Sequence, residues 1–284
     1  MRIERTQVYG FDAALRGMRN PMNSWNRSDS VFCLDPIEAV DCDLDDVAEK
    51  WAEKICSKIG YDQYNEIFDA YWMWLSATGT IRRDTWDDVV ELALIGPNDM
   101  DLARRLIAGG PVHAKFMRQI MVSVDITAPL YWWKEFDTYK VGTVANSTST
   151  MHKLATTPIT IDCFEADDYN PDLVFPQKIF LDDDKPLMVT TTMEQCANSI
   201  IAICEELRLK YLETKDIRYW KELVRWLPSG WRQMRTVTMN YENLRNIYKW
   251  RKNHKLTEWH KFCDWILTLP YARELIAYKN EAKK

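Results

Sequence analysis

One stretch restricts the fold more than any other, because its hydrophobic pattern fits an extended strand and not a helix. Residues 119–129 read QIMVSVDITAP, and β-branched residues take every second position: Ile120, Val122, Val124 and Ile126. Successive side chains of a strand point to opposite faces, so this alternation predicts a strand with one buried face. Pro129 cannot donate a hydrogen bond to a neighbouring strand, so the strand is predicted to end there.

Most other periodic segments have helical spacing, with Asp or Asn near the start and Gly or Pro near the end. Helices are predicted at about residues 10–20, in a block at 43–95, at 98–110, at 130–140 and from about Tyr241 to Leu267. A second strand is predicted at 232–240, where RQMRTVTMN contains β-branched residues and ends at Asn240. Helices outnumber strands, and the strands lack the spacing of βαβ units, so the chain is predicted to be α+β.

Composition and charge argue against several classes of protein. The 284 residues include 37 basic and 42 acidic ones, a net charge of −5, so neither nucleic acid nor an acidic membrane is an expected partner. The seven cysteines are scattered without a CxxC pair. No apolar stretch is long enough for a signal peptide or a membrane span. A soluble cytoplasmic protein with reduced thiols is therefore predicted.

The common metal and nucleotide motifs do not occur. The acid-rich stretch at 161–186 lacks the glycine and the terminal glutamate of a calcium loop, so it is interpreted as a solvated loop. The four histidines form no HExxH or other paired-ligand pattern, and the chain has no P-loop, GxGxxG or GxSxG. No metal site is predicted.

The most unusual polar segment is residues 132–152, WWKEFDTYKVGTVANSTSTMH. Bulky aromatic residues lead into the triplet Thr138-Tyr139-Lys140, and hydroxyl side chains then cluster ahead of His152. A loop rich in hydroxyl and backbone groups can hold an anion or a sugar. Serine and threonine also cap turns between helices. The segment alone leaves both interpretations open.

Two blocks of the chain place particular residues in a recognisable order. In the block at about 101–152, His113 precedes the alternating strand, and a gap of seven residues separates the triplet from Thr148 and the adjacent Ser149. In the block at about 222–266, Leu227-Pro228 precedes the second strand. The helix after that strand carries Asn246 and Arg251. The order and spacing resemble those of the flavin-dependent thymidylate synthases.

The resemblance implies a fold and an assembly. The fold would be a helix-rich α+β domain spanning 1–284, with a small, mainly antiparallel sheet flanked by long helices. Residues 37–96 would be a helical insertion and residues 153–220 an extended loop region. The resemblance further implies a homotetramer whose ligand sites are shared between subunits.

The resemblance also implies a reaction. A pyrimidine deoxynucleotide such as dUMP would be methylated, or otherwise modified, at C5, with methylenetetrahydrofolate as carbon donor, FAD as hydride carrier and NADPH as reductant. Arg251 would hold the polar edge of the pyrimidine and is the expected catalytic residue. The other expected nucleotide-binding residues are Ser147, Thr148, Ser149 and Arg225. The expected flavin-binding residues are His113, Tyr139, Lys140, Asn240 and Asn246.

The chain departs from the family pattern at the anion-binding positions. Thr138, Tyr139 and Lys140 stand where the family has Arg-His-Arg, and the phosphate-binding arginine is replaced by Thr150 or Met151. An arginine contributes both charge and fork geometry to a phosphate site, so its loss is not conservative. Weaker FAD binding than in the family is expected, and the pyrimidine substrate could differ from dUMP.

Two alternatives to the enzyme remain open. A catalytically inactive or repurposed protein could use the same fold to bind a nucleotide in a regulatory role. The altered triplet favours this alternative, whereas Arg251 and Asn240 favour the enzyme. A third possibility is a structural or partner-recruiting role built on the added helical block.

Overall fold

The computed structural model describes residues 1–33, 92–180 and 186–278, together with isolated positions between 45 and 72. The chain divides into two compact units. The larger unit comprises Ile3–Ile126, Tyr139–Ala145 and Thr236–Lys284, and the smaller unit comprises Met1–Arg2, Thr127–Thr138 and Asn146–Arg235. A single domain over 1–284 stays a prediction, and most of the helical insertion predicted at about 37–96 lies outside the described residues.

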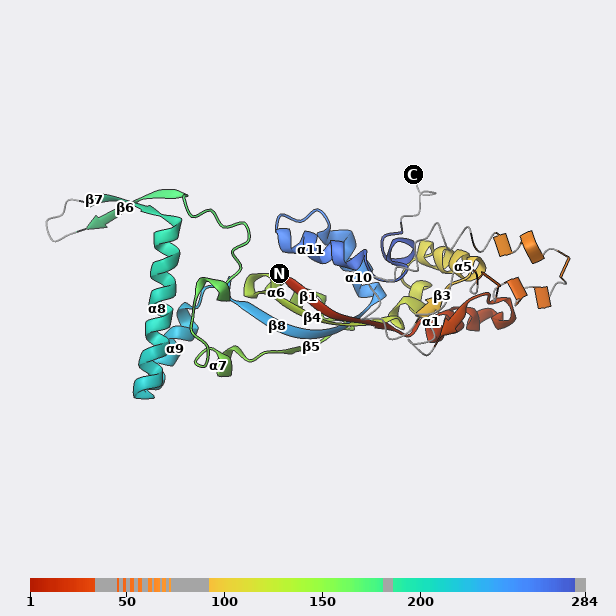
Figure 1. Ribbon diagram of the computed structural model, residues 1–284, viewed down its shortest axis with the longest axis horizontal. Helices are drawn as coiled ribbons and strands as arrows, with labels where there is room; N and C mark the ends of the chain where they lie inside the picture. Colours follow the sequence, from red (N-terminus) through yellow and green to blue (C-terminus); the bar gives the residue numbers. More distant parts are fainter. Residues whose placement is uncertain are drawn as a thin grey trace. The chain divides into compact units, whose positions relative to one another are not determined.

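Both strands expected from the sequence are present. β4 (Met121–Pro129) buries Val122, Val124 and Ile126 and ends at the predicted proline. β8 (Arg232–Asn240) ends at the predicted asparagine. These two strands are neighbours in a four-stranded sheet of order β1–β4–β8–β5 (Figure 1). The edge strands are β1 (Arg2–Tyr9) and β5 (Val144–Ser147).

Aromatic side chains lie at the centre of the core of the larger unit. The ring of Phe11 meets those of Tyr241 and Tyr271 edge to face, with centroids 5.6 and 5.9 Å apart. The Tyr241 hydroxyl donates a 2.6 Å hydrogen bond to the carbonyl of Pro270, and burial raises the pKa of Tyr241. The elements of this core are α1 (Phe11–Arg19), α5 (Pro97–Ala108), η4 (Ala114–Arg118), α10 (Tyr241–Arg251) and the π-helical turn η7 (Ala272–Ile276).

The prediction of one long helix from about Tyr241 to Leu267 is wrong, because the chain turns at residues 252–256. α10 ends at Arg251, and α11 (Thr257–Ile266) begins after the turn. His254 Nδ1 accepts a 3.2 Å hydrogen bond from the backbone N–H of Leu256. A side chain that bonds its own backbone competes with the helical ladder, which explains a break without Gly or Pro. The break lets Trp259 of α11 become fully buried.

Two short strands, one on each side of residues 34–91 in the sequence, pair with each other. β2 (Val31–Cys33) and β3 (Leu92–Leu94) are antiparallel, with Val31 opposite Leu94. The helical block predicted at 43–95 is therefore wrong at its end, where an extended segment pairs with another strand. Two short 3₁₀ turns precede β2: η1 (Asn20–Met22) and η2 (Trp25–Arg27).

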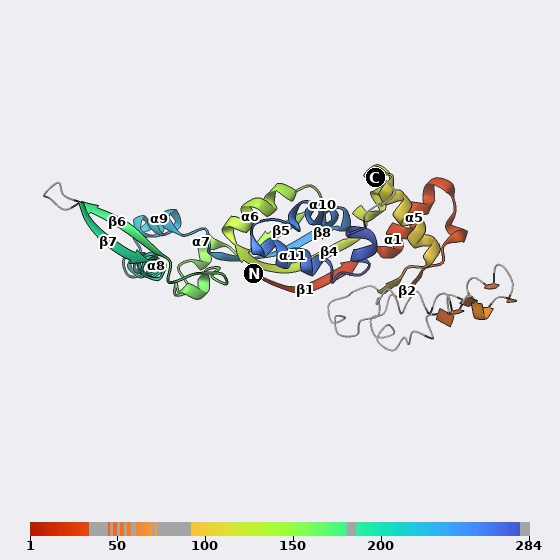
Figure 2. The ribbon, with the colours of Figure 1, turned by 90° about the horizontal axis from the view of Figure 1, so that it is seen from above.

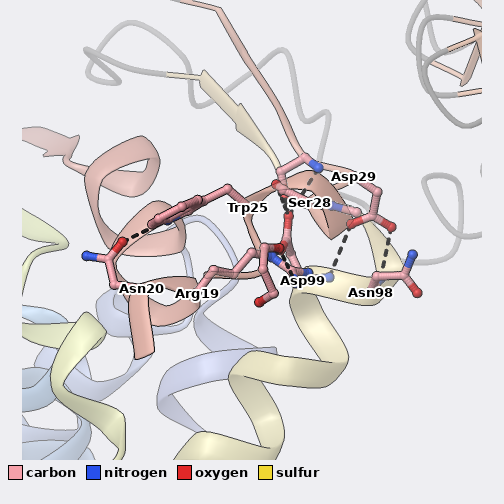
Figure 3. A network of polar contacts seen from close by, with 10 residues as sticks. Arg19, Asn20, Trp25, Ser28, Asp29, Asn98 and Asp99 are labelled. Carbon is pink, nitrogen blue, oxygen red and sulfur yellow. Dashed lines mark hydrogen bonds and ion pairs between the residues drawn. The ribbon is translucent and has the colours of Figure 1, made fainter. Parts of the chain in front are cut away.

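A buried polar network holds the segment before β2 against the start of α5 (Figure 3). The Asp99 carboxylate accepts hydrogen bonds from Arg19 Nε at 2.5 Å and from Ser28 Oγ at 2.7 Å. The Asp29 carboxylate accepts the backbone N–H groups of Asn98 and Asp99 at 2.9 and 3.1 Å. Asp29 and Asp99 are fully buried, and such charges are tolerated only when hydrogen-bonded this completely.

The smaller unit contains elements where the sequence predicted an extended loop at about 153–220. β6 (Val174–Phe180) and β7 (Pro186–Thr192) form an antiparallel hairpin, and α8 (Met193–Thr214) and α9 (Ile217–Trp226) follow it (Figure 2). The loop prediction is wrong for these residues. Pro176 argues against a central strand, but each strand of an isolated hairpin is an edge strand, where proline is tolerated. The hairpin also occupies part of the acid-rich stretch that was interpreted as a loop.

α8 and α9 pack side by side (Figure 1). They share a core with Trp231, the residue directly before β8. The remaining elements of this region are short: α6 (Leu130–Phe136), η5 (Asp137–Tyr139), α7 (Thr150–Lys153) and η6 (Ile161–Cys163). The buried residues of the shared core are Leu154, Ile159, Phe164, Cys204, Leu223 and Trp231. Helices and small sheets together make the chain α+β, as predicted. No helix in the described ranges is long and apolar enough to cross a membrane.

Candidate functional site

Arg251 ends α10, where its guanidinium lies against aromatic rings of the larger unit. The guanidinium carbon lies 4.8 Å from the ring centroid of Trp259 and 5.5 Å from that of Tyr139. The two rings meet edge to face, with centroids 6.1 Å apart. A cation over aromatic faces is attracted by the ring quadrupoles, more strongly where water is excluded. The turn at 252–256 creates this arrangement by returning Trp259 to Arg251.

Tyr139 holds Arg251 by a direct hydrogen bond. Arg251 Nε donates to the Tyr139 hydroxyl oxygen at 2.9 Å. Tyr139 was predicted to bind the flavin and Arg251 the pyrimidine, and the two are in contact although they are 112 positions apart in the chain. The bond fixes the plane of the guanidinium, because Nε is part of that plane. Arg251 is therefore an oriented cation rather than a mobile surface arginine.

The segment after Tyr139 is fastened to the first turn of α10. Asn240 caps this helix by accepting a 3.0 Å hydrogen bond from the backbone N–H of Asn243. Asn243 Nδ2 donates to the carbonyl oxygen of Val141 at 2.5 Å. Gly142 has a positive φ of 75°, and a Cβ there would lie 2.9 Å from Asn240 Nδ2. Tyr139 thus meets one end of α10, and Val141 and Gly142 meet the other.

Three predicted flavin-binding residues of the larger unit have side chains exposed to solvent: His113, Lys140 and Asn246. Within the part of the chain that the structure describes, these side chains form no hydrogen bond or ion pair. His113 precedes η4, Lys140 follows Tyr139, and Asn246 lies in the middle of α10. Each can therefore meet a ligand without first breaking a contact of the protein.

Two of the three predicted nucleotide-binding hydroxyls, those of Thr148 and Ser149, form hydrogen bonds within the smaller unit. Ser149 caps α7 by accepting a 3.2 Å hydrogen bond from the backbone N–H of His152. Thr148 bonds the carbonyl oxygen of Met234 through its backbone N–H at 2.9 Å and its hydroxyl at 3.2 Å. Ser147 ends β5 and is exposed. The capping interpretation therefore describes Ser149, while ligand binding by this loop stays a prediction.

Arg225, predicted to bind the nucleotide, lies exposed on α9. Its guanidinium pairs with Glu222 one turn earlier on the same helix. An exposed pair of this kind contributes little to stability, so it could open for another anion. The structure places Arg225 in the smaller unit and Arg251 in the larger unit.

A second arginine, Arg235 in β8, was missed by the sequence analysis. Its Nη1 donates to the Asp137 carboxylate at 2.9 Å, and its guanidinium carbon lies 4.2 Å from the ring centroid of Trp133. Its Nε donates to Gln233 Oε1 at 3.0 Å, and Gln233 Nε2 donates to the Thr148 carbonyl at 2.9 Å. The alternation of the strand could have placed Arg235 and Gln233 on one face, but nothing in it indicated these partners.

Comparison with solved structures shows the fold. A crystal structure of flavin-dependent thymidylate synthase ThyX from Helicobacter pylori, complexed with FAD and dUMP, aligns with a TM-score of 0.52 and 13% sequence identity, over 97% of this chain and 98% of that chain. A second structure of that enzyme with FAD and dUMP has the same TM-score and identity and covers 97% of both chains. The chain has a ThyX-like fold. At this identity the likeness concerns the fold alone.

Weaker comparisons add nothing to this assignment. The UMP/dUMP methylase PolB from Streptomyces cacaoi, bound with 5-Br UMP, aligns with a TM-score of 0.45 and 14% identity over 64% of this chain and 82% of that chain. That match is too weak to support an argument. No family model and no curated protein sequence matches the chain. Function must therefore be argued from the chain's own residues.

Proposed function

We propose that the chain binds a pyrimidine deoxynucleotide such as dUMP and modifies it at C5. The observation that supports the proposal best is Arg251, whose guanidinium is oriented by the Tyr139 hydroxyl and lies near the Trp259 ring. Arg251 is also the residue for which the sequence resemblance implies a pyrimidine contact. The ThyX-like fold is consistent with this role.

The chemistry of the guanidinium suits this role. Its N–H donors match the carbonyl oxygens on the edge of a pyrimidine ring. As C5 becomes nucleophilic, negative charge develops on the ring, and a fixed cation stabilises that charge more than a mobile one. Methylenetetrahydrofolate as carbon donor, NADPH as reductant and a cytoplasmic location belong to the same proposal.

The residues present allow FAD to bind, with fewer cations than the family pattern has. His113, Lys140 and Asn246 are exposed and can donate hydrogen bonds to a flavin or its diphosphate. Tyr139 and Asn240 are already engaged, with Arg251 and Asn243. Bound FAD would supply hydride transfer. Lys140 is the one cation of the triplet, so we expect FAD to be lost during purification and to rebind on titration.

A nucleotide-binding protein without catalysis is the second candidate. The observation that favours it is Tyr139, which bonds Arg251 from a position where the family has a histidine for the flavin. In this case dUMP would bind, but FAD would not. A role built on the helical block at about 37–96 depends on residues that are mostly outside the described part of the chain.

Calorimetric titration with dUMP, dCMP and uridine tests the proposal. Wild type should bind dUMP, and Arg251→Ala should weaken binding about tenfold to a hundredfold, the effect of losing one charge-assisted contact. Arg251→Lys should restore little, because a point charge cannot reproduce the guanidinium fork. If wild type binds no nucleotide and Arg251→Ala lowers the melting temperature, Arg251 is structural and the proposal fails.

A flavin titration separates the two candidates. The absorbance of FAD in the visible range reports its binding, and conversion of dUMP by the FAD-loaded protein with methylenetetrahydrofolate and NADPH is followed by mass spectrometry. Mass gain on dUMP supports the enzyme. Binding of dUMP without any binding of FAD supports the nucleotide-binding protein.

A further inference from the structure

A cavity of about 290 Å³ opens on the smaller unit, apart from the residues assigned to the nucleotide. Its lining comes from stretches far apart in the sequence, including Arg2, Lys153, Asp162 and Cys163, and Trp231 with Arg232. None of these residues is among those predicted to bind the nucleotide, of which Ser147, Thr148, Ser149 and Arg225 belong to the same unit and Arg251 to the larger one. The function proposed above does not use this cavity.

The walls of the cavity are fastened to each other by backbone contacts. Phe164 forms an antiparallel bridge with Trp231, and their rings meet edge to face with centroids 5.6 Å apart. The backbone N–H of Glu165 donates to the carbonyl of Gly230 at 2.9 Å. The Arg232 guanidinium donates to the backbone carbonyl of Asp162. Because the walls are joined by contacts of the protein itself, little ordering is required when a ligand binds.

The charge of the lining selects an anion. Three cations, Arg2, Lys153 and Arg232, face one carboxylate, Asp162. Neither Lys153 nor Arg232 forms an ion pair with any residue in the described part of the chain. Two threonine hydroxyls complete the polar lining and can donate further hydrogen bonds. The excess of cations over carboxylates matches a dianion better than a monoanion.

We propose that this cavity binds a small phosphorylated ligand. Lys153 and Arg232 contact the phosphate oxygens, where the guanidinium fork and the ammonium point charge are both effective. Trp231, which is 9% exposed, forms the apolar wall against which the organic part of a phosphate monoester packs. Inorganic phosphate shares the anion chemistry but has no group to place on Trp231.

Alkylation of single cysteines locates the binding. Cys163 lines the cavity, whereas Cys196 on α8 does not, and both are free and partly exposed. Phenyl phosphate at ten times its dissociation constant should slow iodoacetamide modification of Cys163 about tenfold, by simple occupancy. Cys196 should react at an unchanged rate, with both sites quantified by peptide mass spectrometry at fixed ionic strength. Equal effects on both cysteines, or none, overturn the proposal.

Charge variants test the recognition. Lys153→Gln should weaken binding of phenyl phosphate about tenfold, because it removes one charge-assisted contact. Lys178→Gln removes the same charge from exposed β6, outside the cavity, and should bind as wild type does. Equal losses in the two lysine variants would show a general charge effect and overturn the proposal.

Two probes distinguish the sources of the anion. Tighter binding of phenyl phosphate than of inorganic phosphate identifies a phosphate ester, with its organic part on Trp231. Equal binding identifies inorganic phosphate as the ligand. Absence of binding by either probe in calorimetry overturns the proposal, whatever the result with dUMP.

Discussion

Tyr139 stands in the middle of the altered triplet, and it contacts the arginine on which the proposed function depends. Tyr139, which was predicted to contact the flavin, supports Arg251 in the structure. The phenol accepts from Nε and leaves the charge of the guanidinium unchanged. A histidine at this position would offer a ring nitrogen with a different reach. This single position could therefore set how strongly the pyrimidine is held.

Removal of the Tyr139 hydroxyl tests this role. Tyr139→Phe keeps the ring beside Arg251 but removes the acceptor, so the guanidinium loses its fixed plane. Affinity for dUMP in calorimetry should fall about tenfold, with little change in melting temperature. Tyr248→Phe is the matched control. Tyr248 lies on α10, the helix that carries Arg251, and its hydroxyl has no hydrogen bond among the described residues. An unchanged affinity in Tyr139→Phe would show that Trp259 alone positions the arginine.

The helix and strand predictions that the structure confirms are those that depend on local sequence pattern. The alternation of β4 and β8, and the Gly or Pro stops of α1 and α5, are local, and the structure confirms them. The break after Arg251 has no such signal, because it depends on a histidine bonding the backbone and on burial of Trp259. The hairpin β6–β7 was not predicted from the sequence, and its first strand contains Pro176, a residue type that ordinarily argues against a strand.

The candidate site was predictable only in part, for the same reason. Arg251, Tyr139 and Asn240 were found by resemblance, and two of them are in contact. That contact joins residues 112 positions apart, which no local pattern encodes. Arg235 was missed because its partners Asp137 and Trp133 come from another segment. The tertiary partners of these polar residues could not be predicted from local sequence pattern.

The network at the start of α5 makes Gly96 indispensable. A Cβ at Gly96 would lie 2.2 Å from the Asp29 carboxyl carbon, and Asp29 is fully buried. Gly96→Ala should therefore displace the carboxylate from the backbone N–H groups of Asn98 and Asp99. We expect a loss of about 2–4 kcal/mol in the free energy of unfolding, measured by urea denaturation.

Gly230→Ala provides the comparison, because its Cβ would make only ordinary contacts, with Phe164 at 3.9 Å. It should change the free energy of unfolding by less than about 1 kcal/mol. If the two variants were equally stable, the network of Figure 3 would not be a determinant of stability.

A second network makes the stability of the smaller unit depend on pH. The Arg208 guanidinium, bonded to Glu205, holds the pKa of that carboxyl below its usual value of 4.5, helped by the backbone N–H of Ile159. A lowered pKa in the folded state means stability that is present above about pH 4.5 and lost as pH falls through the folded value.

Glu205→Gln should therefore lower the melting temperature by about 3–6 °C at pH 7, and the difference should shrink as the pH falls below 4.5. Thermal melts between pH 3 and pH 7 provide the measurement. Glu206→Gln is the matched control, because Glu206 is exposed and its one ion pair within the described part of the chain is a 3.7 Å contact with Lys210. A difference that stays constant with pH would mean that packing, not the charge of Glu205, stabilises this region.

Several large apolar side chains on α8 and α9 are exposed to solvent. Ile203, Ile217 and Trp226 are 58%, 60% and 66% exposed. Two adjacent helices with several such residues form an apolar surface of the kind that a second copy covers. We predict a homo-oligomer, a tetramer if the resemblance holds for assembly. Light scattering at micromolar concentration should then give a multiple of 33.5 kDa.

A charge placed on this surface should lower the mass. Ile203→Glu puts a carboxylate on this apolar surface, where burial against a second copy without a partner costs several kcal/mol, so association should weaken by more than about a hundredfold. Asn198→Glu adds the same charge on another face of α8 and should leave the mass unchanged. Circular dichroism must show that both variants keep their helices, because α8 also supplies Cys204 to the core. A wild-type mass of 33.5 kDa would contradict self-association, and sites shared between subunits would be excluded with it.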